Sequence, residues 1–134
     1  MKTLLIIALT FTTTILMAQN TVTWVGGTPG KESDWNEPKN WSNHKVPNEF
    51  SDVFIKDVGT TTFNFPEIKN GLIEINSLQI TSSGQLKINE SAQLIVYGAT
   101  EGLVKDNVII QGSLIVLDEI SEKEIDLKTV FSNN

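Results

Sequence analysis

Residues 77–116 decide the fold, and they read SLQITSSGQLKINESAQLIVYGATEGLVKDNVIIQGSLIV. Short runs in which polar and apolar residues alternate are separated by Gly, Ser, Asn and Glu, a pattern typical of β-strands with one buried face. Three of these runs, at 85–88, 93–96 and 113–116, share the order polar, Leu, any residue, β-branched, and a turn is expected at 89–91 between the first two. The stretch therefore predicts an all-β protein.

Pairs of apolar residues in this stretch recur at a nearly constant offset along the chain. The recurring pairs are Leu78/Ile80 with Val108/Ile110, and Leu86/Ile88 with Leu114/Val116. A repeat of this kind is typical of a solenoid, in which each coil covers the apolar face of the one before it. We therefore expect a short right-handed parallel β-helix. An antiparallel β-sandwich, which would bury the same residues, is the alternative.

Residues 1–18 have the features of a secretory signal peptide. Lys2 supplies a positive charge, an apolar run begins at Leu4, and Ala18 is a small residue at a plausible cleavage point. The run is interrupted by four threonines and is shorter than the roughly 20 apolar residues of a membrane span. We expect residues 1–18 to be removed and residues 19–134 to work as a secreted, extracellular or cell-surface protein.

Composition narrows the possible partners. The chain has no arginine, no cysteine and a formal net charge of −6. An acidic protein without arginine is a poor match for nucleic acid or anionic lipid. With no cysteine and a single histidine, His44, structural zinc is not expected either. The sequence predicts no metal and no cofactor.

The remaining chain divides into two parts. Residues 19–70 contain all three tryptophans with Pro, Gly and Asn between them, and residues 71–134 contain the repeats. We expect the first part to be an aromatic N-terminal cap and the second to be the β-solenoid. The alternation at 125–131 predicts one more strand at the C-terminal end.

Several short motifs of the first part occur in a fixed order. They are Thr23-Trp24-Val25-Gly26-Gly27, Asp34-Trp35-Asn36, Asn40-Trp41, Val46-Pro47 and Asp52-Val53-Phe54-Ile55. This order resembles an adhesin-like module of bacterial secreted and surface proteins, and the resemblance covers about residues 22–117. It implies a tryptophan-bearing cap followed by a parallel β-helix. It does not imply one particular activity, because one fold serves many functions.

Trp24, Trp35 and Trp41 are the candidate ligand-binding residues. Flat aromatic faces can stack on sugar rings, which would make the protein a carbohydrate-binding module. Tryptophan also buries a large apolar area, and the first coil of a solenoid must be covered. The structural interpretation, in which the three rings close the end of the solenoid, is favoured.

Candidate catalytic groups are sparse. The outward positions of the predicted strands carry Gln79, Lys87, Ile95, Ile109 and Ile115. None is acidic, whereas a polysaccharide-cleaving enzyme needs a pair of carboxylates roughly 5 to 9.5 Å apart. A triad of His44 with Ser42 or Ser51 lacks a recognisable nucleophile turn. We expect no enzyme and no catalytic residue.

Acidic and amide side chains are frequent in the first part of the chain. Asp34, Asn36, Asn40, Asn43, Asn48, Glu49 and Asp52 could supply oxygen ligands to calcium. Their spacing matches no calcium loop, and Asn and Asp also cap turns through hydrogen bonds to the backbone. Turn capping is therefore the favoured interpretation.

The outward isoleucines predict an apolar patch, which either meets a partner or is covered by the loop at 97–105. We therefore expect a non-enzymatic extracellular structural or adhesion protein of bacterial surface type. A carbohydrate-binding module is the alternative. The expected partners are an extracellular polysaccharide or a cell-surface component, and the edge of the last coil could also pair with a second copy.

Overall fold

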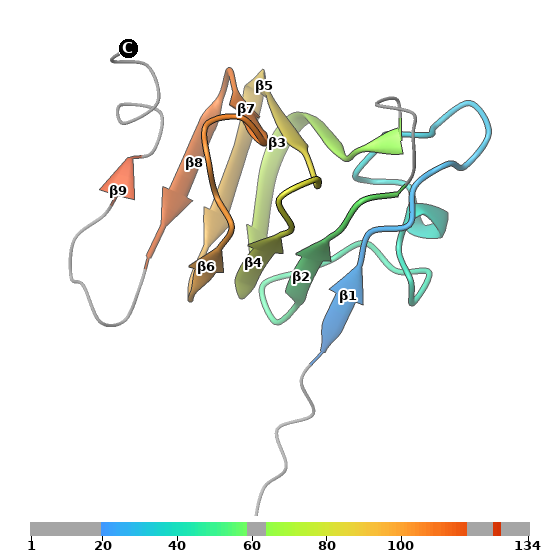
Figure 1. Cartoon of the computed structure of the whole chain (residues 1–134), viewed down its shortest axis with the longest axis horizontal. Helices are drawn as coiled ribbons and strands as arrows, with labels where there is room; N and C mark the ends of the chain where they lie inside the picture. The colour runs from blue at the N-terminus through green and yellow to red at the C-terminus, as the bar shows by residue number, and fades with distance from the viewer. Residues whose placement is uncertain (1–19, 59–63, 118–124, 127–134) are drawn as a thin grey trace, which may run out of the picture.

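A computed structural model of the chain describes residues 20–58, 64–117 and 125–126 (Figure 1). These residues are mainly β-strand and loop with one short 3-10 helix, so the all-β prediction is confirmed. The elements are β1 (Thr21–Thr23), η1 (Pro38–Asn40), β2 (Asp52–Ile55), β3 (Glu67–Ile75), β4 (Ser77–Ile80), β5 (Leu86–Val96), β6 (Thr100–Glu101), β7 (Val108–Ile110), β8 (Ser113–Val116) and β9 (Ile125–Asp126).

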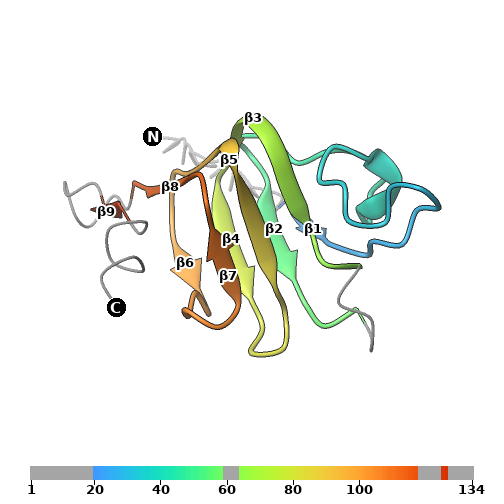
Figure 2. The same ribbon diagram turned by 90° about the horizontal axis from the view of Figure 1, so that it is seen from above.

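The strands form two sheets, and from β2 to β7 the chain alternates between them. The first sheet has the order β1-β2-β4-β6, and the second has the order β3-β5-β8-β9 with β7 also beside β5. Neighbouring strands from β1 to β8 are parallel, and β9 lies antiparallel to β8. The antiparallel sandwich is therefore wrong. Figures 1 and 2 both show η1 and its loops at one end of the sheets and β9 at the other.

The register of the parallel strands shows which residues of successive coils lie side by side. Leu78 lies beside Thr100 in the first sheet, and Leu86 lies beside Val108 in the second. The offset read from the sequence would instead have placed Leu78 beside Val108 and Leu86 beside Leu114, and that prediction is wrong. The loops between strands differ in length, so strands of similar sequence are not always neighbours.

One predicted pair of strands is a single long strand. The turn expected at 89–91 is absent, because β5 continues from Leu86 to Val96. Its register against β3 shifts between Ile68 and Asn70. Such a bulge lets a strand bend without ending. The sequence signals for a turn therefore mark a bend in this strand.

Apolar side chains on the inner faces stack in rows across neighbouring strands. The rows are Val22–Val53–Leu78, Ile55–Ile80, Ile68–Ile88–Ile110, Ile73–Leu94–Leu114 and Ile75–Val96–Val116. Most of these side chains are fully buried. The alternation read from the sequence is the pattern that directs them inward, because successive side chains of a strand point to opposite faces.

One close backbone contact in the first sheet requires glycine. Gly102, which follows β6, has φ +76, and a Cβ there would lie 1.8 Å from the carbonyl oxygen of Ile80. Only a residue without a side chain can bring the chain this close to β4.

Backbone contacts close the N-terminal end of both sheets. Trp41 forms an antiparallel bridge with Trp24 after β1, and Asp34 forms a parallel bridge with Glu67 of β3. The segment between β1 and β2 thus covers the outer strand of each sheet. This blunts edges that would otherwise present unpaired backbone groups.

Two expectations fall partly or wholly outside the described residues. The signal peptide at 1–18 lies outside them, and of the strand expected at 125–131 only Ile125 and Asp126 are described. Across the described ranges, no helical segment could span a lipid bilayer.

Candidate functional site

The three tryptophans lie in the core and not on the surface. Each has an exposed fraction of 0%. Trp41 lies between the other two, with ring centroids 4.9 Å from Trp24 and 4.7 Å from Trp35 in edge-to-face geometry. The indole N–H of Trp41 donates to the Trp35 carbonyl oxygen at 2.8 Å, and that of Trp24 donates to the Asn64 carbonyl oxygen. No ring has a free face on which a sugar could stack.

Burial therefore overturns the use of Trp24, Trp35 and Trp41 as ligand-binding residues. Their sequence spacing could not separate the two interpretations, because a stacking platform and a core cluster use the same residue type. The preference for a structural role agrees with the packing.

A buried asparagine fixes the loop around these rings. The side chain of Asn40 is fully buried and satisfies three backbone groups. It donates to the carbonyl oxygens of Lys31 at 2.7 Å and Asp34 at 3.0 Å, and it accepts from the N–H of Thr28 at 3.0 Å. Asn40 ends η1, and the next residue, Trp41, enters the core. One residue thus couples the loop at 28–34 to the tryptophan cluster.

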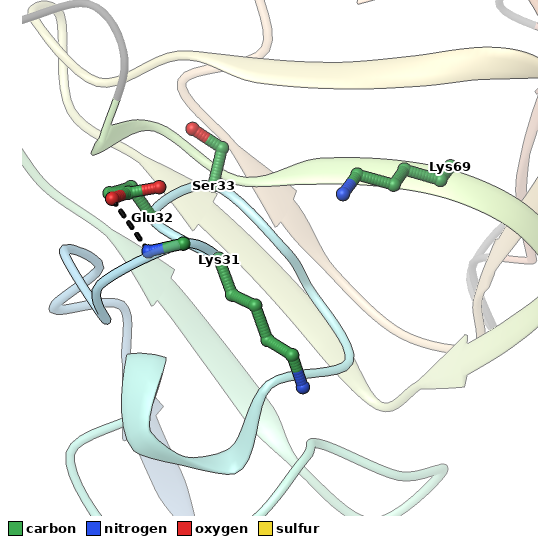
Figure 3. A pocket seen from close by; sticks show the side chains of 5 residues that line it. Lys31, Glu32, Ser33 and Lys69 are labelled. Carbon is green, nitrogen blue, oxygen red and sulfur yellow. Dashed lines mark hydrogen bonds between the residues drawn. The ribbon is translucent and has the colours of Figure 1, made fainter.

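This loop borders a shallow hollow of about 470 Å³, lined by Gly30–Ser33 and Lys69 (Figure 3). The charges around it are already paired. Lys31 Nζ lies 2.8 Å from the Glu37 carboxylate, and Lys69 Nζ lies 3.7 Å from that of Asp34.

The ionisation of these groups agrees with that pairing. The hydrogen bond with Glu37 raises the pKa of Lys31 and lowers that of Glu37. Backbone N–H groups of Glu32 itself and of Gly30 lower the pKa of Glu32. The hollow thus offers fixed, compensated charges and little attraction for a free ion.

Three of the acidic and amide side chains cap turns, as predicted. The side-chain oxygens of Asp34, Asn43 and Asn48 each accept from the backbone N–H two residues further on, at 3.0 Å. Asp52 accepts from Asn76 Nδ2 at 2.7 Å and from Ser77 Oγ at 2.6 Å. Among the residues that the structure describes, no three His, Cys, Asp or Glu side chains gather as metal ligands.

The candidate triad residues are occupied elsewhere. His44 is exposed and has φ +55, a turn conformation. The hydroxyl of Ser42 accepts from the N–H of Thr23, and that of Ser51 accepts from the N–H of Asn48. These bonds fix loops at the ends of β1 and β2.

The outer face of the second sheet carries one well-defined ion pair. Glu67 accepts from Lys87 Nζ and from Asn89 Nδ2, each at 3.0 Å. The hydrogen bond from Lys87 is the main reason that the pKa of Glu67 is lowered. A carboxylate held ionised in this way is a poor general acid.

The same face carries the predicted outward isoleucines. Ile109 is 53% exposed, and Ile95 and Ile115 are half-buried neighbours on β5 and β8. On the outer face of the first sheet, Gln79 lies between Phe54 and Glu101.

Two exposed aromatic residues, not predicted from the sequence, lie just before β2 and just after β5. Phe50 is 73% exposed and Tyr97 is 39% exposed. Phe50 precedes Ser51, whose carbonyl oxygen accepts from Asn76 N at 2.9 Å, and the Asn76 carbonyl oxygen accepts from Gly98 N at 2.7 Å. The segments that carry Phe50 and Tyr97 are thus the first and third of three stacked segments, with Asn76 on the one between them, and we call this region the Phe50–Tyr97 corner.

Carboxylates surround the tyrosine of this corner. The Tyr97 hydroxyl donates to the Glu74 carboxylate. This hydrogen bond is the main cause that raises the pKa of Tyr97, and the negative charges of Glu74 and Glu49 add to it. One feature of the sequence could have drawn attention to Tyr97, because it is the only tyrosine and follows a predicted strand. That feature said nothing of Phe50, which lies far away along the chain.

Comparison with known proteins gives a family without an assigned activity. The model of a domain of unknown function, DUF8693, matches residues 23–124, and the chain belongs to this family. No curated protein and no solved structure matches the chain.

Proposed function

We propose that the chain is a non-enzymatic, exported structural or adhesion protein of bacterial surface type, built as a short right-handed parallel β-helix under an aromatic N-terminal cap. The observation that carries the proposal is the pairing of strands. Strands from successive segments of the chain lie side by side in parallel, in two sheets. Such stacking makes a stiff scaffold from local coils and leaves its outer faces free for contact.

The tryptophan cluster supports the cap. Trp24 and Trp41 bridge their backbones beside β1, and their rings pack at the same end of the core. A solenoid needs such closure, because its first coil has no preceding coil to cover it. The apolar outer face around Ile95 and Ile115 supports a contact role, since aliphatic side chains on neighbouring outer positions favour association.

The experiment combines secretion and attachment. The full chain with a C-terminal epitope tag is produced in a bacterium, beside a variant that lacks residues 2–18. We expect the full chain to lose its leader and to reach the medium or the outer surface, where protease added to intact cells removes it. The variant should remain inside and protected.

Attachment is then measured in the organism that carries the gene. Cells that lack the gene should adhere less to a solid surface or to one another, and restoring the gene should restore adhesion. A chain retained in the cytoplasm with its leader intact would contradict the proposal. So would unchanged attachment in both strains.

A further inference from the structure

We propose that the Phe50–Tyr97 corner binds an extended, neutral polysaccharide chain. The inference deepens the proposed adhesive role by naming a partner, and it rests on that role. It also moves carbohydrate recognition away from the tryptophans, whose rings are buried.

Both aromatic side chains of the corner are exposed to solvent. Among the described aromatic residues, the tryptophans are fully buried, whereas Phe50 and Tyr97 expose 73% and 39% of their surface. Leu117 is 38% exposed and follows β8, one strand beyond Tyr97. Exposed aromatic and aliphatic groups on neighbouring segments are a common feature of binding sites.

The segments that carry the two aromatic side chains are separated by one layer of the β-structure. The backbone bonds from Asn76 to Ser51 and from Gly98 to Asn76 place three chain segments in consecutive layers. Layers in a β-structure lie about 4.8 Å apart, so the segments that carry Phe50 and Tyr97 are about 10 Å apart. Two aromatic side chains that project from segments at that separation suit an extended sugar chain that contacts both and passes the layer between them.

Polar side chains lie beside the aromatic residues of the corner. The Glu74 carboxylate accepts from the Tyr97 hydroxyl and so holds the end of this side chain in place. Asn76 lies between the two aromatic layers, and its amide is held by Asp52 at 2.7 Å. Carboxylate and amide groups beside an aromatic ring match the hydroxyl groups and apolar C–H faces of a sugar.

The negative charge of the corner favours neutral polysaccharides over acidic ones. Glu49 and Glu74 both act on Tyr97 through their negative charges. A polymer of uronic acids or sulfated sugars would bring like charge to these carboxylates and would be repelled. Neutral chains avoid this repulsion.

The test is a binding assay with the secreted, processed protein. The probes are microcrystalline cellulose, chitin and xylan as neutral polymers, alginate and polygalacturonate as acidic polymers, and poly-lysine as a cationic polymer. The variants are Phe50→Ala, Tyr97→Ala and the double substitution, with Tyr97→Phe to keep the ring. Val25→Ala removes an exposed apolar side chain of the N-terminal cap, which is 44% exposed, and is the matched control. Circular dichroism and thermal unfolding check that every variant folds.

We expect at least one neutral polymer to retain the protein. Each single alanine variant should weaken binding about tenfold, as the loss of an anchoring aromatic group does at an interface. The double variant should fall to background. Tyr97→Phe should bind better than Tyr97→Ala, and Val25→Ala should match the wild type. Binding to no polymer, or binding unchanged in a folded double variant, would overturn the inference.

Retention on poly-lysine alone, reversed by salt, would also overturn it in favour of a cationic partner. The assay separates the two proposals. A protein that reaches the surface and supports attachment but binds no polysaccharide leaves the adhesive role intact and removes only its named partner.

Discussion

Replacing Asn40 by alanine tests how much the cap depends on one buried amide. The substitution removes hydrogen bonds to Thr28, Lys31 and Asp34 from a side chain with no exposed surface. Each such bond contributes roughly 1 kcal/mol net, so the free energy of unfolding should fall by about 3 kcal/mol. For a domain of this size, that corresponds to about 10 to 15 °C in Tm.

The assay is equilibrium unfolding in urea followed by tryptophan fluorescence. The signal is local to the change, because Trp41 is the next residue after Asn40 and packs against both other tryptophans. Asn36→Ala is the matched control, since Asn36 lies in the same segment and is exposed. We expect this control to stay within about 0.5 kcal/mol of the wild type.

An aspartate at the same position sharpens the test. In Asn40→Asp, an ionised carboxylate would face the carbonyl oxygens of Lys31 and Asp34, where the amide now donates. The variant should be less stable than Asn40→Ala at neutral pH and should recover part of the loss at acid pH, where a protonated carboxyl can donate. A loss for Asn40→Ala as small as that of the Asn36 control would refute the reasoning.

Three further predictions concern the core and two titrating groups. Leu94→Ala should lower the free energy of unfolding by about 2 to 5 kcal/mol in urea titrations, because Leu94 is fully buried in the central row. Ile95→Ala, on the opposite face, should cost far less. Because the pKa of Glu67 is lowered in the folded protein, its ionised carboxylate should add to the free energy of unfolding above pH 4.5, and this contribution should be lost as the pH falls through the folded pKa. In acid unfolding curves, Glu67→Gln should therefore lose less stability between neutral and acid pH than the wild type. Tyr97, the only tyrosine, should ionise above its ordinary pKa of 10.0 in ultraviolet titration, and Glu74→Gln should bring that pKa down. An unshifted Tyr97 would contradict the hydrogen bond.

Local alternation predicted which residues enter the core better than it predicted how the strands pair. Leu86, Leu94 and Leu114 are buried as the pattern required. The residues that pair with them could not be predicted from the alternation, because the register between two strands depends on the length of the loop that joins them. The expected turn at 89–91 failed for a related reason: polar residues and Asn favour turns, but strand pairing along β3 outweighs that local preference.

The candidate site was harder to predict than the fold. Tryptophan is informative in a sequence because it is rare, yet its large apolar area is also the strongest reason to bury it. The segment that carries Trp24, Trp35 and Trp41 closes the sheets, so the rings follow it into the core. Phe50 and Tyr97 came to lie on one corner only through the stacking of strands, which no short motif records.

Rigidity links the corner to the scaffold beneath it. Phe50 itself is exposed, but the next residue, Ser51, is 2% exposed, and its carbonyl oxygen holds the N–H of Asn76. Tyr97 likewise continues directly from the buried Val96, and its N–H donates to the Ile75 carbonyl oxygen at 3.0 Å. Both aromatic side chains therefore project from backbone that is fixed by the stacked sheets. A ligand that spans them would lose little free energy to ordering the protein, so even two small platforms can contribute to binding when the protein is present in many copies on a surface.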